Sequence, residues 1–225
     1  VSRFVKDGDY ISFDFSSFTR GPLSLIREII RQRKRDLWYS AKFTLMESTL
    51  LAAAGAVSRI DVGFMGLGDT LNRAVEEGKI KVTEWTNGTL TLRHMEGGMG
   101  VPFLPTRALL GTDTLKYSGA KVVRDPFGGK PIALVPAVTP DVGLIHVHQA
   151  DVYGNARCFG PGVSPLETAA ASRKYRLPSA PGTATLTSCA PLASLCAWRP
   201  AAGLGASGPS SAGVALAAAR PAPSR

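Results

Sequence analysis

Apolar residues recur with two different spacings along the first 172 residues. The spacing typical of strands occurs at residues 10–15, 37–44, 60–65, 80–85 and 141–147. The spacing or composition typical of helices occurs at residues 22–35, 45–57, 70–77, 89–96 and 166–172. Because strands alternate with helices, we expect an α/β fold with an open, largely parallel, Rossmann-like sheet and flanking helices.

The pattern changes after residue 114. Short apolar segments at residues 121–124 and 132–135 flank the turn-forming sequence Pro126-Phe127-Gly128-Gly129. This arrangement predicts a β-hairpin inserted into the α/β fold. Residues 141–147 then form a near-continuous apolar run, which is typical of a strand buried on both faces.

Residues 97–114 combine glycines and prolines with a short apolar stretch, in the sequence GGMGVPFLPTRALLGTDT. Glycine lets a backbone approach a ligand closely, and proline fixes the direction of the chain without offering an N–H. We therefore expect an irregular segment that is neither helix nor regular strand. We interpret it as the wall of a substrate pocket, against the alternative of an irregular buried connection.

The composition changes near residue 175. From residue 177 to the last residue, 33 of 49 residues are Ala, Pro, Ser or Gly, and none is acidic. Such a segment buries too little apolar surface to offset the entropy of ordering it. We expect an α/β domain at residues 1–174 and a disordered, low-complexity tail at 175–225. The abrupt change also suggests an ending altered by a shifted reading frame or a spliced end.

Charge and thiol content limit the partners and the compartment. The formal charge of the chain is +9, but residues 1–172 hold 20 basic and 17 acidic residues, a net charge of +3. We therefore expect no nucleic-acid partner. No apolar run reaches the roughly 18 residues that span a bilayer, so we expect no membrane segment. Three cysteines without a C-x-x-C spacing favour a reduced, cytoplasmic location.

Four groups of residues follow one another along the chain: residues 7–11 with 20–22, residues 87–90, residues 97–114, and residues 140–147 with 150–155. Together they resemble the A (alpha) subunit of family I CoA-transferases, which include glutaconate and 3-oxoacid CoA-transferases. The resemblance covers residues 1–174 and implies a CoA-transferase-like α/β fold.

The resemblance also implies an activity and a partner. Family members transfer CoA between carboxylic acids through a glutamyl-CoA intermediate, which is covalent catalysis by a carboxylate. Their glutamate lies on the B (beta) subunit in a Glu-Asn-Gly turn, and the corresponding residues here are Thr86-Asn87-Gly88. Because a threonine cannot form the acyl anhydride, we expect no catalytic residue in this chain. The resemblance implies a beta-subunit partner, acyl-CoA and a carboxylic acid as substrates, and no further cofactor.

One departure from the family pattern leaves alternatives open. Asp14-Phe15-Ser16 stands where the family usually has Gly-Gly-Phe, and a carboxylate near a developing oxyanion would oppose it. A related branch of the same fold resembles CoA-ester hydrolases that open rings, and this is the enzymatic alternative. A non-catalytic scaffold subunit is the alternative outside enzymes.

The candidate contacts to acyl-CoA and the acid are glycines, polar groups and apolar residues of these motifs. They are Ser16, Ser17, Arg20, Asn87, Gly88, Met99, Gly100, Phe103, Thr106, Arg107, Gly111 and Thr112. Arginine suits a carboxylic acid because its guanidinium binds a carboxylate through two parallel hydrogen bonds.

Other chemically capable residues are expected to have structural roles. His146 and His148 suit a metal by spacing, but no third ligand is evident, so we expect no metal. We expect His94 to pack or lie at the surface, and Glu84 and Glu96 to form structural pairs. Asp113 is expected to brace its loop.

Overall fold

The computed structural model describes residues 1–13, 21–66, 69–150, 156–158, 165–173, 175–179, 187–188 and 214–216. Several expectations fall outside these residues. They are the Asp14-Phe15-Ser16 departure, the candidate contacts Ser16, Ser17 and Arg20, the loop at residues 151–155, and most of the predicted tail.

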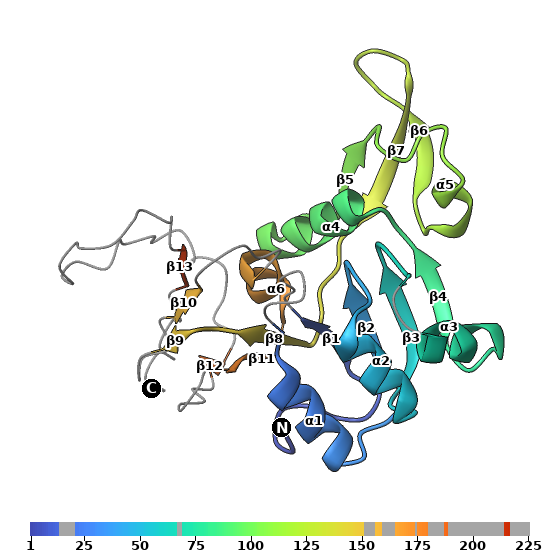
Figure 1. The fold of residues 1–225 in the computed structure, drawn as a ribbon. Coiled ribbons are helices and arrows are strands. Elements are labelled where there is room, and N and C mark those ends of the chain that lie inside the picture. The colour runs from blue at the N-terminus through green and yellow to red at the C-terminus, as the bar shows by residue number, and fades with distance from the viewer. Residues whose placement is uncertain are drawn as a thin grey trace, which may run out of the picture.

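The main sheet has seven strands in the order β12-β11-β8-β1-β2-β3-β4 (Figure 1). These are β1 (Tyr10–Phe13), β2 (Leu37–Ala41), β3 (Val57–Val62), β4 (Lys81–Glu84), β8 (Val142–His146), β11 (Tyr175–Ser179) and β12 (Thr187–Ser188). Every neighbouring pair from β11 to β4 is parallel, and only the β11–β12 pair of this sheet is antiparallel. The predicted open, largely parallel sheet is confirmed.

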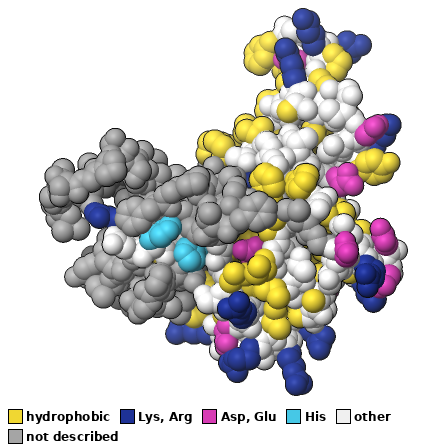
Figure 2. All heavy atoms as spheres, in the orientation of Figure 1, with side chains coloured by type: hydrophobic (Ala, Val, Ile, Leu, Met, Phe, Trp, Pro, Cys, Tyr) yellow, Lys and Arg dark blue, Asp and Glu magenta, His cyan; other side chains and the backbone are white. Residues whose placement is uncertain are grey.

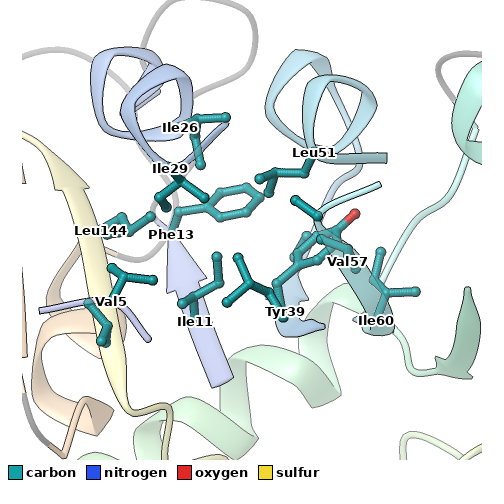
Figure 3. Packing of buried hydrophobic residues seen from close by; sticks show 14 of the residues in the cluster. Val5, Ile11, Phe13, Ile26, Ile29, Tyr39, Leu51, Val57, Ile60 and Leu144 are labelled. Atoms are coloured by element: carbon teal, nitrogen blue, oxygen red, sulfur yellow. The ribbon is translucent and has the colours of Figure 1, made fainter. Parts of the chain in front are cut away.

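The helices are α1 (Leu23–Arg31), α2 (Met46–Ala53), α3 (Asp69–Glu76), α4 (Asn87–Met99), α5 (Thr114–Tyr117) and α6 (Pro165–Ala171). Helices α1 and α2 cover one face of the sheet, where Ile26, Ile29 and Leu51 point toward Phe13 (Figure 3). Helices α4 and α6 pack on each other, and α6 contacts β8 and β1. Figure 1 shows α4 between the parallel sheet and a smaller one.

The smaller sheet has three antiparallel strands in the order β5-β7-β6. They are β5 (Phe103–Thr106), β6 (Lys121–Arg124) and β7 (Pro131–Pro136), so the predicted hairpin is confirmed. A further small sheet joins β9 (Gln149–Ala150), β10 (Ala156–Cys158) and β13 (Val214–Leu216). We call the β5-β7-β6 sheet the small sheet from here on.

Alternation along β1 sorts apolar and polar side chains to opposite faces of the parallel sheet. Ile11 and Phe13 are buried in the main core toward α1 and α2. Ser12 points to the opposite face and contacts His94 of α4. A strand with period two therefore builds the apolar core on one side and a polar layer under α4 on the other.

Strand β8 lies in the interior of the parallel sheet, between β1 and β11. Its residues Val142 to Ile145 are buried, as the apolar run predicts. Beyond it, β11 pairs with β8 in parallel over five residue pairs, from Tyr175 to Ser179. The predicted domain boundary at residue 174 stays a prediction, with β11 lying directly after it.

The prediction of an irregular segment at residues 97–114 is wrong in part. Gly97 and Gly98 are in the last turn of α4. The residue that caps this end of the helix, Gly100, adopts a φ of 74°. A Cβ at Gly98 would lie 2.7 Å from the Cβ of Ala170 on α6, and a Cβ at Gly97 would strike the carbonyl of Val138. The glycines therefore allow close packing of a helix, and β5 follows as a regular strand.

Candidate functional site

The candidate site begins where the parallel strands end. In open α/β sheets, ligands bind in the crevice outside the carboxyl ends of the strands. The chain runs from β4 through Trp85 and Thr86 into α4, so the amino end of α4 lies at this edge. A Cβ at Gly63, which follows β3, would overlap the Asn87 side chain and lie 2.8 Å from the carbonyl oxygen of Lys42. Gly63 thus lets α4 begin against the ends of β2 and β3.

Thr86 caps α4. Its hydroxyl accepts a hydrogen bond from the Thr89 N–H at 3.1 Å, and its own N–H donates to the Thr89 hydroxyl at 2.9 Å. Such a reciprocal pair satisfies backbone donors that the helix leaves free at its start. The Thr86 hydroxyl therefore serves the helix, and Asn87 and Gly88 are its first two residues.

Asn87 carries an unused polar atom at this position. Its Oδ1 is buried and accepts no hydrogen bond from the residues that the structure describes. Gly88 beside it is exposed, and a Cβ there would meet only the Thr86 hydroxyl oxygen, at 3.9 Å. The amino end of a helix also carries partial positive charge, which favours an anionic group. The backbone N–H groups at this helix start suit a phosphate or carboxylate oxygen, whereas Asn87 Oδ1 only accepts and suits a hydrogen-bond donor of the ligand.

Glu47 lies at the carboxyl edge of the sheet, and the sequence did not single it out. It is in the first turn of α2, and its carboxyl group packs directly against Gly21. Burial raises the pKa of Glu47 above its ordinary value. His146, at the end of β8, donates from Nδ1 to the Gly21 carbonyl at 3.1 Å. A glutamate at the start of the helix that follows a buried strand was the available signal, but its contact is with Gly21, which is far away in sequence.

His94 lies in the polar layer under α4. Its Nδ1 donates to the Leu90 carbonyl oxygen at 2.8 Å, because that oxygen can only accept. Nε2 therefore accepts from the Ser12 hydroxyl at 2.9 Å. Burial, together with the nearby Lys42 charge, lowers the pKa of His94 to about 3. The ring is neutral and buried, which confirms a packing role.

Glu96 does not form the structural pair that the sequence predicts. Its side chain is fully buried, and neither carboxyl oxygen makes a well-formed hydrogen bond within the described part of the chain. Burial raises the pKa of Glu96 to about 7, an effect that the Arg93 charge partly offsets. A buried carboxyl group without hydrogen bonds is destabilising in its charged form. The expectation of a pair was wrong because the neighbouring cation, Arg93, is engaged with Asp61.

The remaining candidates lie on or after the carboxyl end of α4. Met99 and Phe103 are about half exposed. Figure 2 shows hydrophobic and basic side chains gathered on the lobe at its top, where the small sheet lies in Figure 1. Thr106 accepts from the Ala108 N–H at 3.1 Å, and Thr112 donates to the Leu109 carbonyl at 2.8 Å. These two hydroxyls therefore brace their own turns.

The other three members of this group are exposed backbone or side-chain positions. Gly100 and Gly111 adopt φ of 74° and 77°, and Arg107 is exposed. Asp113 braces its turn as expected, through a 2.7 Å contact with Lys116, but both side chains are largely exposed.

The candidates divide into two groups that α4 separates. Asn87 and Gly88 are at its first turn, and Met99 and Gly100 at its last. A 13-residue helix places its first and last residues about 18 Å apart at 1.5 Å per residue. This chain therefore does not bring all of its described candidates to one point.

The described ranges contain no group of three or more His, Cys, Asp or Glu residues placed to hold a metal. His146 and His148 are 5.6 Å apart between ring centroids, with the rings edge to face. No helix in the described part of the chain has the length and apolar character required to cross a bilayer.

An open parallel sheet, with polar groups at its carboxyl edge and a small sheet beyond α4, defines a class of α/β ligand-binding proteins. Within that class, residues 1–162 match the family model described as Coenzyme A transferase. The chain belongs to the CoA-transferase family.

Two named relatives and a solved structure are similar to this chain. The A subunit of the 3-oxoadipate CoA-transferase from Pseudomonas knackmussii is 35% identical over 71% of this chain and 60% of its own length. The cholesterol ring-cleaving hydrolase IpdA subunit of Rhodococcus jostii is 30% identical over 69% of this chain and 57% of its own. The crystal structure of the decarboxylase AibA/AibB superimposes with a TM-score of 0.72 at 27% identity, covering 81% of this chain and 74% of the other. This chain thus spans less than two thirds of the length of the two named relatives.

Proposed function

We propose that this chain is the A subunit of an acyl-CoA:carboxylate CoA-transferase. CoA passes between carboxylic acids through a glutamyl-CoA intermediate, and the glutamate belongs to a beta subunit. The observation that carries the proposal is the family match over residues 1–162. A cytoplasmic location, with acyl-CoA as substrate and no other cofactor, completes the proposal.

Thr86 supports the proposal that the nucleophile belongs to the beta subunit. The family glutamate corresponds to Thr86, whose hydroxyl is bound to the Thr89 backbone and cannot form an acyl anhydride. In the first half-reaction the glutamate carboxylate attacks the acyl-CoA thioester and the CoA thiolate leaves, and the thiolate then attacks the glutamyl carbonyl of the anhydride and releases the donor acid. In the second half-reaction the acceptor carboxylate attacks glutamyl-CoA and the same two steps run in reverse. In this proposal the chain binds and orients the two substrates, and the partner supplies the attacking carboxylate.

Two groups of residues share the binding. The backbone N–H groups of Asn87 and Gly88, at the amino end of α4, receive an anionic oxygen of CoA or of the acid. Met99 and Phe103 offer half-exposed apolar surface for the acyl chain, and Arg107 is an exposed cation for the carboxylate. Ser16, Ser17, Arg20, Gly100, Thr106, Gly111 and Thr112 remain proposed contacts. Because α4 separates the groups, the extended acyl-CoA molecule spans them.

A second candidate is a subunit of a CoA-ester ring-opening hydrolase. The observation that favours it is the 30% identity to the cholesterol ring-cleaving hydrolase subunit of Rhodococcus jostii. Glu47 is then of interest, because a carboxyl group with a raised pKa at the carboxyl edge of the sheet suits general acid–base work.

The test is an assay of this chain co-expressed with its beta subunit. Acyl-CoA donors are mixed with carboxylic acid acceptors, beginning with 3-oxoadipate, and the products are separated by mass. CoA transfer produces the acceptor's CoA ester without release of free thiol. Ring-opening hydrolysis adds one water to a cyclic acyl group, keeps its thioester to CoA, and needs no acceptor. A ring-opened CoA ester without any CoA transfer would replace the transferase by the hydrolase, and robust transfer by the isolated chain would contradict the partner requirement.

A further inference from the structure

Arg93, at the middle of α4, contacts three separate parts of the molecule. Its Nη1 lies 3.1 Å from Asp61 Oδ2 on β3, and its Nε donates to the Pro136 carbonyl of β7 at 2.8 Å. Its guanidinium carbon lies 3.9 Å from the centre of the Trp85 ring, between β4 and α4. Its own carbonyl accepts from the Val138 N–H at 2.9 Å. One residue therefore connects the parallel sheet, α4 and the small sheet.

The anchor of Arg93 in the parallel sheet is itself held firmly. Asp61 Oδ2 also accepts from the Tyr10 hydroxyl at 2.6 Å, across the sheet from β1. Tyr10 stacks on Trp38 at 4.2 Å, and its N–H donates to Asp141 at 2.9 Å. Burial and the Asp61 charge raise the pKa of the Tyr10 hydroxyl well above its ordinary value, so the hydroxyl remains a donor.

The two apolar cores on either side of this contact share no residue. The main core lies between the parallel sheet and helices α1 and α2 (Figure 3). The second core, under the small sheet, consists of Trp85, Leu90, Leu109, Ala133, Val135 and Val138. The Arg93–Asp61 pair is almost completely buried, with side chains 8% and 2% exposed. A polar contact between two apolar cores fixes their relative position, since misalignment leaves a buried charge unpaired.

The contacts of Arg93 require a guanidinium. Two of its N–H groups donate in the guanidinium plane, and its flat face covers the Trp85 ring. A lysine ammonium is a compact charge on a single stem and cannot serve all three partners in one position. The arrangement is thus specific to arginine.

We propose that Arg93 is a positioning residue for the CoA transfer proposed above. It holds the small sheet, which carries Phe103 and Thr106, at a fixed position relative to Asn87 and the carboxyl edge of the parallel sheet. The effect of Arg93 on catalysis rests on the proposed function. The docking of the small sheet through Arg93 does not depend on that function.

The structural part is tested by hydrogen–deuterium exchange of the full chain. The variants are R93K, which keeps the charge, and R93M, which keeps the bulk, with R59K as the matched control. Arg59 is exposed, lies on β3 like Asp61, and covers Trp38 with its guanidinium carbon 6.0 Å from the ring centre. In R93K we expect at least tenfold faster exchange at Ala137 and Val138, with unchanged exchange in β2 and β3. R59K should match the wild type at all these positions.

The catalytic part is tested on the complex with the beta subunit. We expect R93K to lower kcat for CoA transfer at least tenfold with a smaller change in KM, because misplaced walls disturb the reacting geometry. R59K should leave both constants unchanged. If R93K exchanged faster by the same factor at all of its amides, or exchanged at the wild-type rate, the positioning role of Arg93 would be overturned. Wild-type complex without transfer activity would overturn the proposed function, and the exchange data would still decide the docking.

Discussion

Glu96 is the residue whose charge state most clearly depends on the fold. Its pKa is about 7 in the folded chain and ordinarily 4.5, so the folded state binds a proton more tightly than the unfolded state. Its contribution to stability is therefore greatest below pH 4.5, declines as the pH rises from 4.5 to 7, and is lost above pH 7.

Replacement of Glu96 by glutamine removes this dependence. Between pH 5 and pH 8, the unfolding free energy of the wild type should fall by about 2 kcal/mol relative to E96Q. Urea unfolding at both pH values measures the difference. E84Q, at an exposed position on β4, is the control and should follow the wild type. Parallel pH profiles for wild type and E96Q would show that Glu96 has an ordinary pKa.

At the residue scale, the sequence predicted the roles of single side chains better than it predicted their contacts with distant residues. The packing role of His94 followed from its place in a helix, and the bracing role of Asp113 from its neighbouring threonines. Glu47 was missed because its burial depends on Gly21, which lies 26 positions earlier in the chain. The buried, unpaired state of Glu96 depends on the engagement of Arg93 by Asp61, which no local pattern encodes.

The packing of α4 on α6 depends on a glycine. A Cβ at Gly98 would lie 2.7 Å from that of Ala170, closer than carbon atoms pack. G98V should therefore reduce the unfolding free energy by about 2 kcal/mol or more, through overpacking. G88A is the control within the same helix. Its Cβ meets only the Thr86 hydroxyl oxygen, at an ordinary 3.9 Å, and should stabilise the helix by up to about 1 kcal/mol.

Both variants are compared by urea unfolding. Equal stability of G98V and the wild type would mean that α4 and α6 separate without cost, contrary to the packing described.

The start of α4 depends on the Thr86 cap. T86A removes the hydroxyl that accepts from the Thr89 N–H and should cost about 1 kcal/mol of stability. T86S keeps the hydroxyl and should retain most of the wild-type value. Thermal unfolding of the wild type, T86A and T86S measures the series. A T86A protein as stable as T86S would show that the Thr86 hydroxyl does not stabilise the chain.

At the element scale, the periodic segments were predicted well. The strands β1, β2, β4 and β8 and the β6–β7 hairpin occur where apolar patterns indicated them, whereas β3 begins three residues before its predicted start and ends at Val62. Residues 97–100 were misjudged because glycine normally opposes helix formation. Here the cost is offset by close contact of Gly97 with Val138 and of Gly98 with Ala170, and such tertiary packing is invisible in local sequence.

At the scale of the whole molecule, the sequence predicted the parallel sheet but not the position of the small sheet. Alternating strands and helices are sufficient for the former. The latter depends on Arg93, whose partners Asp61 and Pro136 lie 32 and 43 residues away. The described candidate residues divide into two groups along α4, and the pocket wall predicted at residues 97–114 includes only the group at its carboxyl end.

The division of labour between two subunits is the central claim, and covalent trapping tests it most directly. The complex with the beta subunit is incubated with acyl-CoA, treated with borohydride or hydroxylamine, and mapped by peptide mass. We predict a modified glutamate on the beta subunit, with none on this chain. A modified carboxylate on this chain, at Glu47 or elsewhere, would contradict the account.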